Sequence, residues 1–305
     1  MPHRIDLYPT RGKTECILER PDPVVYGDGR TESPFGMTAQ EVESYEENGF
    51  LVLPNVFSPQ EVSLFLQEFC RLGESPELQE REELIREPSS NMLRSIFNQH
   101  KFSELFERLS RDRRILDKVT QLLGSQVYIH QGRINIKPAY SGKSFPWHSD
   151  FETWHAEDGI PSCRMLTGWV MLTGNNEFNG PLYLVPGSHR SFVSCAGRAP
   201  EDHHKFSLRK QSYGVPSADA VRTLVDEGGL IGVYGEPGTL VFHEANLMHG
   251  SPDNISPWAR TNLMFVYNSV ENSPLDKPFG ASKPRPEYLR NTDLMPLKAV
   301  ENPFG

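Results

Sequence analysis

The sequence predicts a mainly β protein with helices at its N-terminal end. Up to about residue 124 the chain carries helix-start signals and amphipathic stretches. From residue 126 onward, strand-like segments are separated by Gly, Pro and Asn. Helices followed by strands, without a regular alternation of the two, favour an antiparallel β core such as a jelly roll or a barrel.

The composition and charge of the chain indicate which classes of molecule it binds. The chain has 305 residues, a formal net charge of -9 and four cysteines without C-x-x-C spacing. This acidic balance argues against nucleic acid and anionic membranes as partners, and the cysteines do not form a disulfide framework. Because we find neither an apolar leader nor a run long enough to cross a bilayer, we expect a cytoplasmic protein that acts on a small molecule. The sequence leaves open whether the chain forms a homodimer.

The N-terminal region is expected to contain an arm and several helices. Residues 1–37 are rich in Pro, Gly and charge, and predict an ordered arm or a loose leader. Capping boxes then predict the starts of two helices. The second helix has a proline at its first position, and we expect it to end at Gly73. The capping pairs are Thr38 with Glu41 and Ser58 with Glu61. Residues 76–124 are predicted to be mostly helical.

The segment "VYIHQGRINIK" predicts a strand with an unusually polar face. Side chains alternate between the two faces of a strand, so every second residue shares a face. The polar face is predicted to hold Val127, Ile129, Gln131, Arg133, Asn135 and Lys137. Such a face either contacts water or lines a polar cavity. "MLTGWVMLT", "PLYLVPGSH", "GTLVFHEANLMHG" and "TNLMFVYNSV" are further predicted strands.

The stretch "FPWHSDFETWHAEDGIP" contains a candidate metal site. If it is a strand, His148 and Asp150 point to one face, and His249 in "NLMHGS" offers a third ligand. Two histidines and a carboxylate that leave open positions are typical of non-haem Fe(II) oxygenases. They also suit Zn²⁺, so a metal-binding protein or hydrolase of another class is an alternative.

Arg260 follows His249 by eleven residues and has a role in such a site. An organic acid that chelates iron through a keto and a carboxyl oxygen carries a second carboxylate at its far end. A planar guanidinium on a neighbouring strand can bind that carboxylate with two hydrogen bonds.

These motifs, with "FNGPLYLVPGSHRSFVSCAGRAPEDHHKFSLRKQ" and "FVYNSVEN", resemble the phytanoyl-CoA dioxygenase-like family of Fe(II)/2-oxoglutarate oxygenases over almost the whole chain. The resemblance implies a double-stranded β-helix, the jelly-roll core shared with cupins. We expect one oxygenase domain over residues 1–305, with the arm and helices in 1–125, the β-helix in 126–275 and a tail in 276–305.

The resemblance also implies an activity: hydroxylation of ectoine to 5-hydroxyectoine, a step of compatible-solute synthesis, with Fe(II) as cofactor and 2-oxoglutarate and O2 as cosubstrates. It places Fe(II) on His148, Asp150 and His249. It places 2-oxoglutarate on Arg260, Asn135, Phe145 and Thr167, and the substrate on Gln131, Trp154, His243 and Met264.

Two of these positions depart from the family pattern. His243 and Met264 stand where Phe is usual, on the substrate wall, and Thr167 replaces a usual Ser. The same chemistry on another small polar or cyclic amino-acid-like substrate is therefore an alternative. The long connection 195–228 is expected to cover the substrate as a lid.

Overall fold

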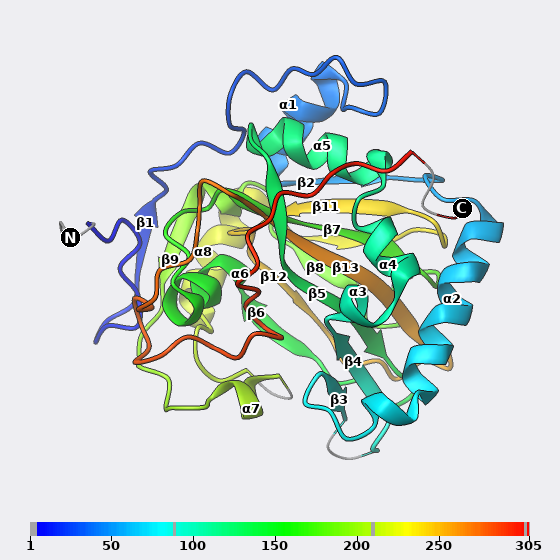
Figure 1. The fold of residues 1–305 in the computed structure, drawn as a ribbon. Coiled ribbons are helices and arrows are strands. Elements are labelled where there is room, and N and C mark those ends of the chain that lie inside the picture. The colour runs from blue at the N-terminus through cyan, green and yellow to red at the C-terminus, as the bar shows by residue number, and fades with distance from the viewer. Residues whose placement is uncertain (1–4, 88–89, 209–210, 302–303, 305) are drawn as a thin grey trace.

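The computed structural model describes residues 5–87, 90–208, 211–301 and 304. It has the predicted class, with antiparallel sheets in the middle and helices around them (Figure 1). Two sheets face each other and form the double-stranded β-helix, and a short two-stranded sheet lies beside them. No helix of the described residues is long and apolar enough to span a bilayer.

The large sheet runs in the order β2 (Phe50–Leu53), β11 (Leu240–Glu244), β7 (Met165–Met171), β13 (Arg260–Ser269), β5 (Val127–Lys137), β4 (Leu93–Phe97) and β3 (Leu84–Arg86). The small sheet runs in the order β10 (Ile231–Val233), β8 (Leu182–Leu184), β12 (His249–Ser251) and β6 (Phe145–His148). The pair is β1 (Cys16–Glu19) with β9 (Ser191–Ser194).

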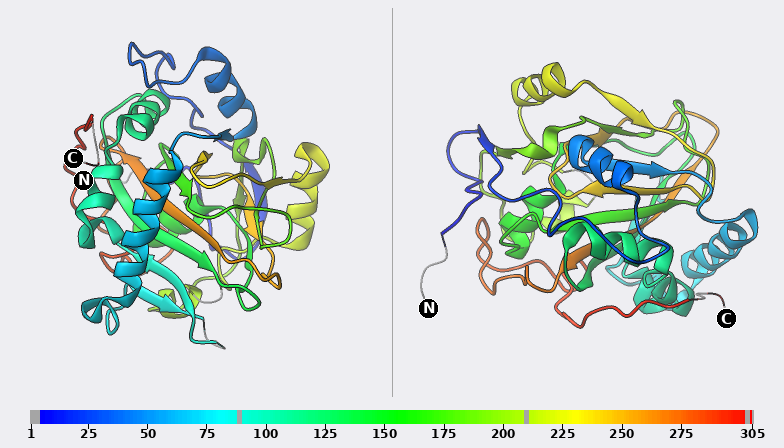
Figure 2. Two further views of the ribbon diagram at one scale, coloured as in Figure 1. Left: turned by 90° about the vertical axis from the view of Figure 1, so that its right-hand side faces the viewer. Right: turned by 90° about the horizontal axis from the view of Figure 1, so that it is seen from above.

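The helices are α1 (Ala39–Asn48), α2 (Pro59–Glu74), α3 (Gln99–Phe102), α4 (Glu104–Leu109), α5 (Arg113–Leu123), α6 (Asp150–Thr153), α7 (His204–Ser207) and α8 (Ala218–Gly228). Short 3₁₀ helices span Pro76–Leu78 and Ser188–Arg190, and a π-helical turn spans Trp154–Asp158. The expected lid, 195–228, therefore contains α7 and α8. The views of Figure 2 place α8, in yellow, on the opposite side of the molecule from α4 and α5.

Both predicted capping boxes are confirmed. In each, the cap hydroxyl accepts from the backbone N–H three residues on, and the Glu there accepts from the cap N–H. Helix α2 continues through Gly73 and ends at Glu74, one residue later than predicted.

The prediction that residues 76–124 are mostly helical is wrong in its first half. The segments "LIR" and "LRSIF" form β3 and β4, which extend the large sheet beside β5. Their apolar runs are too short to decide between helix and strand, and pairing with the long strand β5 decides for strand.

The main core lies between the large sheet and the helices. Alternate residues of the central strands, such as Ile134, Leu263 and Phe265, point outward and pack with apolar side chains of α2, α4 and α5. The other face of the same strands points toward the small sheet and lines a cavity, because successive side chains of a strand alternate.

A β-bulge in β5 corrects the predicted pattern of its faces. Gln131 pairs with Val266 and Ile129 with Tyr267, so His130 is an extra residue opposite β13. The bulge reverses the alternation. Val127 and Ile129 consequently join the apolar core, whereas the polar residues after the bulge face the cavity.

The described part of the N-terminal arm, residues 5–37, is ordered and is fixed by buried ion pairs. Arg11 binds Glu152 with two bonds of 2.6 and 2.9 Å, and Arg20 lies 2.9 Å from Glu244. These four side chains are almost inaccessible to solvent. The arm thereby contacts the chain two residues after Asp150 and, through Arg20, at the end of β11.

We predict that Arg11→Met lowers the free energy of unfolding by about 3 kcal/mol, because it leaves the Glu152 carboxylate buried without its cation. Urea denaturation measures the change. Lys143→Met is the control, since Lys143 and Asp253 form an exposed pair whose loss costs less than about 1 kcal/mol. Equal effects of the two substitutions would show that the arm is not held by this ion pair.

Candidate metal centre and its cavity

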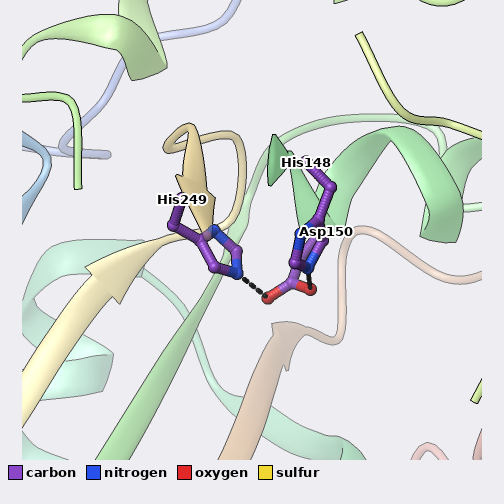
Figure 3. Close-up of side chains that lie close together, drawn as sticks. All are labelled: His148, Asp150 and His249. Atoms are coloured by element: carbon purple, nitrogen blue, oxygen red, sulfur yellow. Dashed lines mark ion pairs between the residues drawn. The ribbon is translucent and has the colours of Figure 1, made fainter. Parts of the chain in front are cut away.

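His148, Asp150 and His249 converge between the two sheets (Figure 3). One donor atom from each lies within 4.8 Å of the others. The Nε2 atoms of His148 and His249 lie 3.5 and 3.9 Å from the Asp150 carboxylate oxygens. His148 ends β6 and His249 begins β12, and the two residues stand directly opposite each other in the antiparallel pairing.

The local structure that places Asp150 differs from the prediction. His148 and Asp150 do not share a strand face, because β6 ends at His148 and Asp150 opens helix α6. Ser149 caps this helix by accepting from the Glu152 N–H, and its hydroxyl donates to Asn246 at 2.9 Å. The capped turn, rather than strand alternation, directs the carboxylate toward the histidines.

Backbone carbonyls fix the orientation of both ligand imidazoles. The Nδ1 atom of His148 lies 2.7 Å from the Pro146 oxygen, and that of His249 lies 2.9 Å from the Leu247 oxygen. Since a carbonyl only accepts, each Nδ1 carries the proton and each Nε2 has a free lone pair. Both lone pairs are available for a metal ion.

The electrostatics favour the protonation states that bind metals. Burial and the neighbouring His148 lower the pKa of His249 to about 3. Burial alone would raise the pKa of Asp150, but the nearby imidazoles, led by His249, outweigh it and hold that pKa well below its usual range. The donor set is therefore one carboxylate and two imidazoles whose Nε2 lone pairs are free, the set of the Fe(II) facial triad.

A cavity opens from the triad toward the large sheet. It encloses about 650 Å³, part of it open to solvent. Most of the residues that the sequence nominated line it: Gln131, Asn135, Phe145, His148, Asp150, Trp154, Thr167, His249, Arg260 and Met264. His243 does not line it.

Arg260 is a buried cation that faces this cavity. Its guanidinium donates to the Gly180 carbonyl at 2.7 Å and to the Asn135 side-chain oxygen at 3.1 Å, both of which are neutral. Burial and the nearby Arg94 lower its pKa to about 10, so it stays charged at neutral pH. Within the described residues, no carboxylate forms an ion pair with it.

Three of the side chains nominated from the sequence bring different chemical groups to the cavity: a hydroxyl, an amide and an aromatic ring. The Thr167 hydroxyl is buried and has no hydrogen-bond partner among the described residues. The Gln131 side-chain N–H donates to the Leu289 carbonyl of the C-terminal segment at 2.9 Å. Trp154 is 3% exposed and stands edge-on to His130.

The sequence did not nominate Arg133, Tyr213 or Arg285, although all three border the cavity or its mouth. Among the described residues, Arg133 donates hydrogen bonds to the Ser95 hydroxyl alone, at 2.9 and 3.1 Å, and stacks over the rings of Phe97 and Phe145, whereas Arg285 is paired with Asp158. Arg133 lies on the polar face of β5, between Gln131 and Asn135, and that position is a signal that could have found it. Tyr213 belongs to the connection 195–228 that was expected to cover the substrate, whereas nothing in the sequence indicates that Arg285 returns to this cavity.

The fold and the donor set define the class: a double-stranded β-helix protein with a two-histidine, one-carboxylate metal site. The phytanoyl-CoA dioxygenase (PhyH) family profile matches residues 45–262, and the chain belongs to this family.

Two relatives match nearly the whole chain. Ectoine dioxygenase of Bordetella bronchiseptica is 50% identical over 285 residues, which cover 93% of this chain and 92% of that protein. Ectoine dioxygenase of Streptomyces avermitilis is 44% identical over 293 residues, covering 96% and 98%.

Solved structures agree with the fold of the whole chain. EctD from S. alaskensis with 2-oxoglutarate and 5-hydroxyectoine superposes with a TM-score of 0.88 at 38% identity, covering 98% of this chain and 99% of that one. The same enzyme with bound Fe has a TM-score of 0.87 at 37% identity and the same coverage.

We predict that Asp150→Ala lowers Fe(II) affinity by more than about 100-fold, since even outer hydrogen-bond partners of metal ligands are worth about 10- to 100-fold. Anaerobic Fe(II) titration measures the affinity. Asp219→Ala, at an exposed position of α8, is the control and leaves it unchanged. Wild-type affinity in the Asp150 variant would remove this carboxylate from the ligand set.

Proposed function

We propose that this protein is an Fe(II)- and 2-oxoglutarate-dependent dioxygenase that hydroxylates ectoine to 5-hydroxyectoine. The observation that carries the proposal is the cavity itself, where a two-histidine, one-carboxylate site faces a buried arginine that has no carboxylate partner among the described residues. The similarity to ectoine dioxygenases over 93% or more of the chain supports the substrate.

His148, Asp150 and His249 hold Fe(II) in this proposal. Three protein ligands leave positions for a chelating cosubstrate and for O2. Iron bound with 2-oxoglutarate would supply the oxygen activation that inserts one oxygen atom of O2 into a C–H bond, while the other oxygen atom converts 2-oxoglutarate to succinate and CO2. The residues of this chain bind and orient the two organic molecules and exclude water from the reacting carbon.

Arg260 binds the distal carboxylate of 2-oxoglutarate. Its guanidinium is held by Asn135 and Gly180 and needs a counter-charge. The unpartnered Thr167 hydroxyl, from the large sheet, and the ring of Phe145, from the small sheet, line the same cavity and complete the cosubstrate site. A dicarboxylate therefore satisfies groups that the described part of the fold leaves without partners.

We predict that Arg260→Met raises the dissociation constant of 2-oxoglutarate about ten- to a hundredfold, because a charge-assisted bond is worth about 1.5–3 kcal/mol. Arg260→Lys keeps the charge without the planar fork and should fall between wild type and Arg260→Met. The absorbance band of the anaerobic Fe(II)–2-oxoglutarate complex reports the titration. Reduced Fe(II) affinity with unchanged 2-oxoglutarate affinity would contradict this assignment.

The remaining part of the cavity suits a compact zwitterion. Ectoine carries a delocalised amidinium-like cation in its ring and a carboxylate outside it. Trp154 offers an aromatic face to the cation, an attraction worth about 0.5–2 kcal/mol. Arg133, which lacks a carboxylate partner of its own among the described residues, is the candidate for the carboxylate, and Gln131 lies beside it on β5.

We predict that Trp154→Ala reduces ectoine turnover strongly and Trp154→Phe much less, because Phe keeps an aromatic face. Neither substitution should change the 2-oxoglutarate affinity. The melting temperature is the control measurement, since Trp154 also packs in a buried cluster with Phe151 and Ile160. If both variants lost activity in proportion to stability, Trp154 would be a packing residue only.

Met264 supports one alternative, the same chemistry on another small polar or cyclic amino-acid-like substrate. It lines the cavity at a position where the family pattern has Phe. Mass spectrometry of the products formed from ectoine, Fe(II), 2-oxoglutarate and air decides between the two. Succinate together with 5-hydroxyectoine supports the proposal, and succinate without hydroxylated ectoine supports the alternative. If no succinate formed, both the proposed function and the alternative would be contradicted.

A further inference from the structure

His243 lies behind the metal site rather than in the cavity wall. It is on the inner face of β11, directly opposite Thr167 of β7, and is 1% exposed. Its side chain packs between Trp169 and Asp150. A polar ring at such a buried position needs hydrogen-bond partners on both nitrogens.

Trp169 determines which nitrogen of His243 carries the proton. The indole Nε1–H donates to Nδ1 of His243 at 3.2 Å. Because an indole N–H can only donate, Nδ1 must accept with its lone pair. The proton of the neutral imidazole is therefore on Nε2.

The Nε2 atom of His243 faces Asp150. It lies 3.6 Å from Oδ2 of that carboxylate, and no hydrogen-bond partner for it is found among the described residues. The three side chains whose donor atoms lie mutually within 4.8 Å are His148, Asp150 and His249, so His243 stands outside this group. Within the group its ring lies beside the imidazole of His249, with centroids 5.2 Å apart, and its Nε2 points to the Asp150 carboxylate.

We propose that His243 is a positioning residue for iron binding, whose Nε2–H donates to the Asp150 carboxylate oxygen that the metal does not use. A small rotation of the carboxylate shortens the 3.6 Å separation to a hydrogen bond. The bond restrains the carboxylate in the orientation that presents its other oxygen to the metal. This inference rests on the proposed function of the same site and adds a ligand-orienting residue to it.

The contacts from Trp169 through His243 to Asp150 fix the direction in which the Nε2–H of His243 points. Trp169 borders the cavity and packs with Leu247 and Val241, so its indole is held by the core. A phenylalanine at position 243, the residue that the family pattern has there, would fill a similar volume but could not donate. The hydrogen bond to Asp150 therefore depends on the histidine that this sequence has at position 243.

The experiment compares His243→Phe with His243→Gln in the full-length protein, by anaerobic Fe(II) titration without 2-oxoglutarate. We expect His243→Phe to weaken Fe(II) binding about tenfold, the lower end of the range for partners of metal ligands. Gln can place an amide N–H near the position of Nε2, so His243→Gln should bind Fe(II) more tightly than His243→Phe. The Fe(II)–2-oxoglutarate absorbance band should shift in His243→Phe and return toward wild type in His243→Gln.

His100→Phe is the matched control, because it makes the same substitution at a histidine of α3 that does not line the cavity. It should leave Fe(II) affinity unchanged. Unchanged Fe(II) affinity and an unshifted band in His243→Phe would overturn the inference, and so would His243→Gln binding as weakly as His243→Phe. These results are distinct from failure of the proposed function, in which the wild-type protein itself would not bind Fe(II) with 2-oxoglutarate.

Discussion

The antiparallel pairing of β6 with β12 is the constraint on which the metal site depends. It sets His148 directly opposite His249, with ring centroids 4.2 Å apart. Two imidazoles this close would repel each other if both were protonated, and burial together with His148 lowers the pKa of His249. A shift of this pairing by one residue would turn one histidine to the other face of the small sheet. The Ser149 hydrogen bond to Asn246 ties the two ligand-bearing segments together just beyond the pairing.

A second organising feature is the excess of positive charge around Phe145. The guanidinium of Arg94 lies 4.0 Å from the ring centroid and that of Arg133 lies 5.0 Å from it, and Arg260 opens onto the same cavity. Burial, together with Arg260 and Arg94, lowers the pKa of Lys137 to about 6. Such crowding of cations is unfavourable, and the ion pair of Glu87 with Arg94 offsets only part of it. A dianionic ligand relieves the repulsion between these cations, and this relief contributes favourably to the free energy of ligand binding.

Much of this architecture could be predicted from local signals, and the failures have identifiable causes. The helix starts at Thr38 and Ser58 are local, because each cap is completed within three residues. The strands β3 and β4 were missed because their identity is decided by pairing with β5, far along the chain. The bulge at His130 was missed because alternation carries no mark of an inserted residue. In the site, Arg260 and the triad have motif-like spacing, whereas the placement of His243 behind Asp150 follows only from the pairing of β11 with β7.

The ordered arm has a consequence for how the protein can be shortened. Glu152 and Glu244 are buried carboxylates on the two segments that surround the metal site, and their cations come from Arg11 and Arg20, more than a hundred residues earlier in the chain. A shortened variant that begins after Asp22 would retain both carboxylates and lose both counter-charges. Trimming this Pro- and Gly-rich segment as if it were a dispensable tail would therefore remove part of the scaffold that surrounds the metal ligands. An affinity tag is better attached at the other end of the chain, where Glu301 is exposed to solvent.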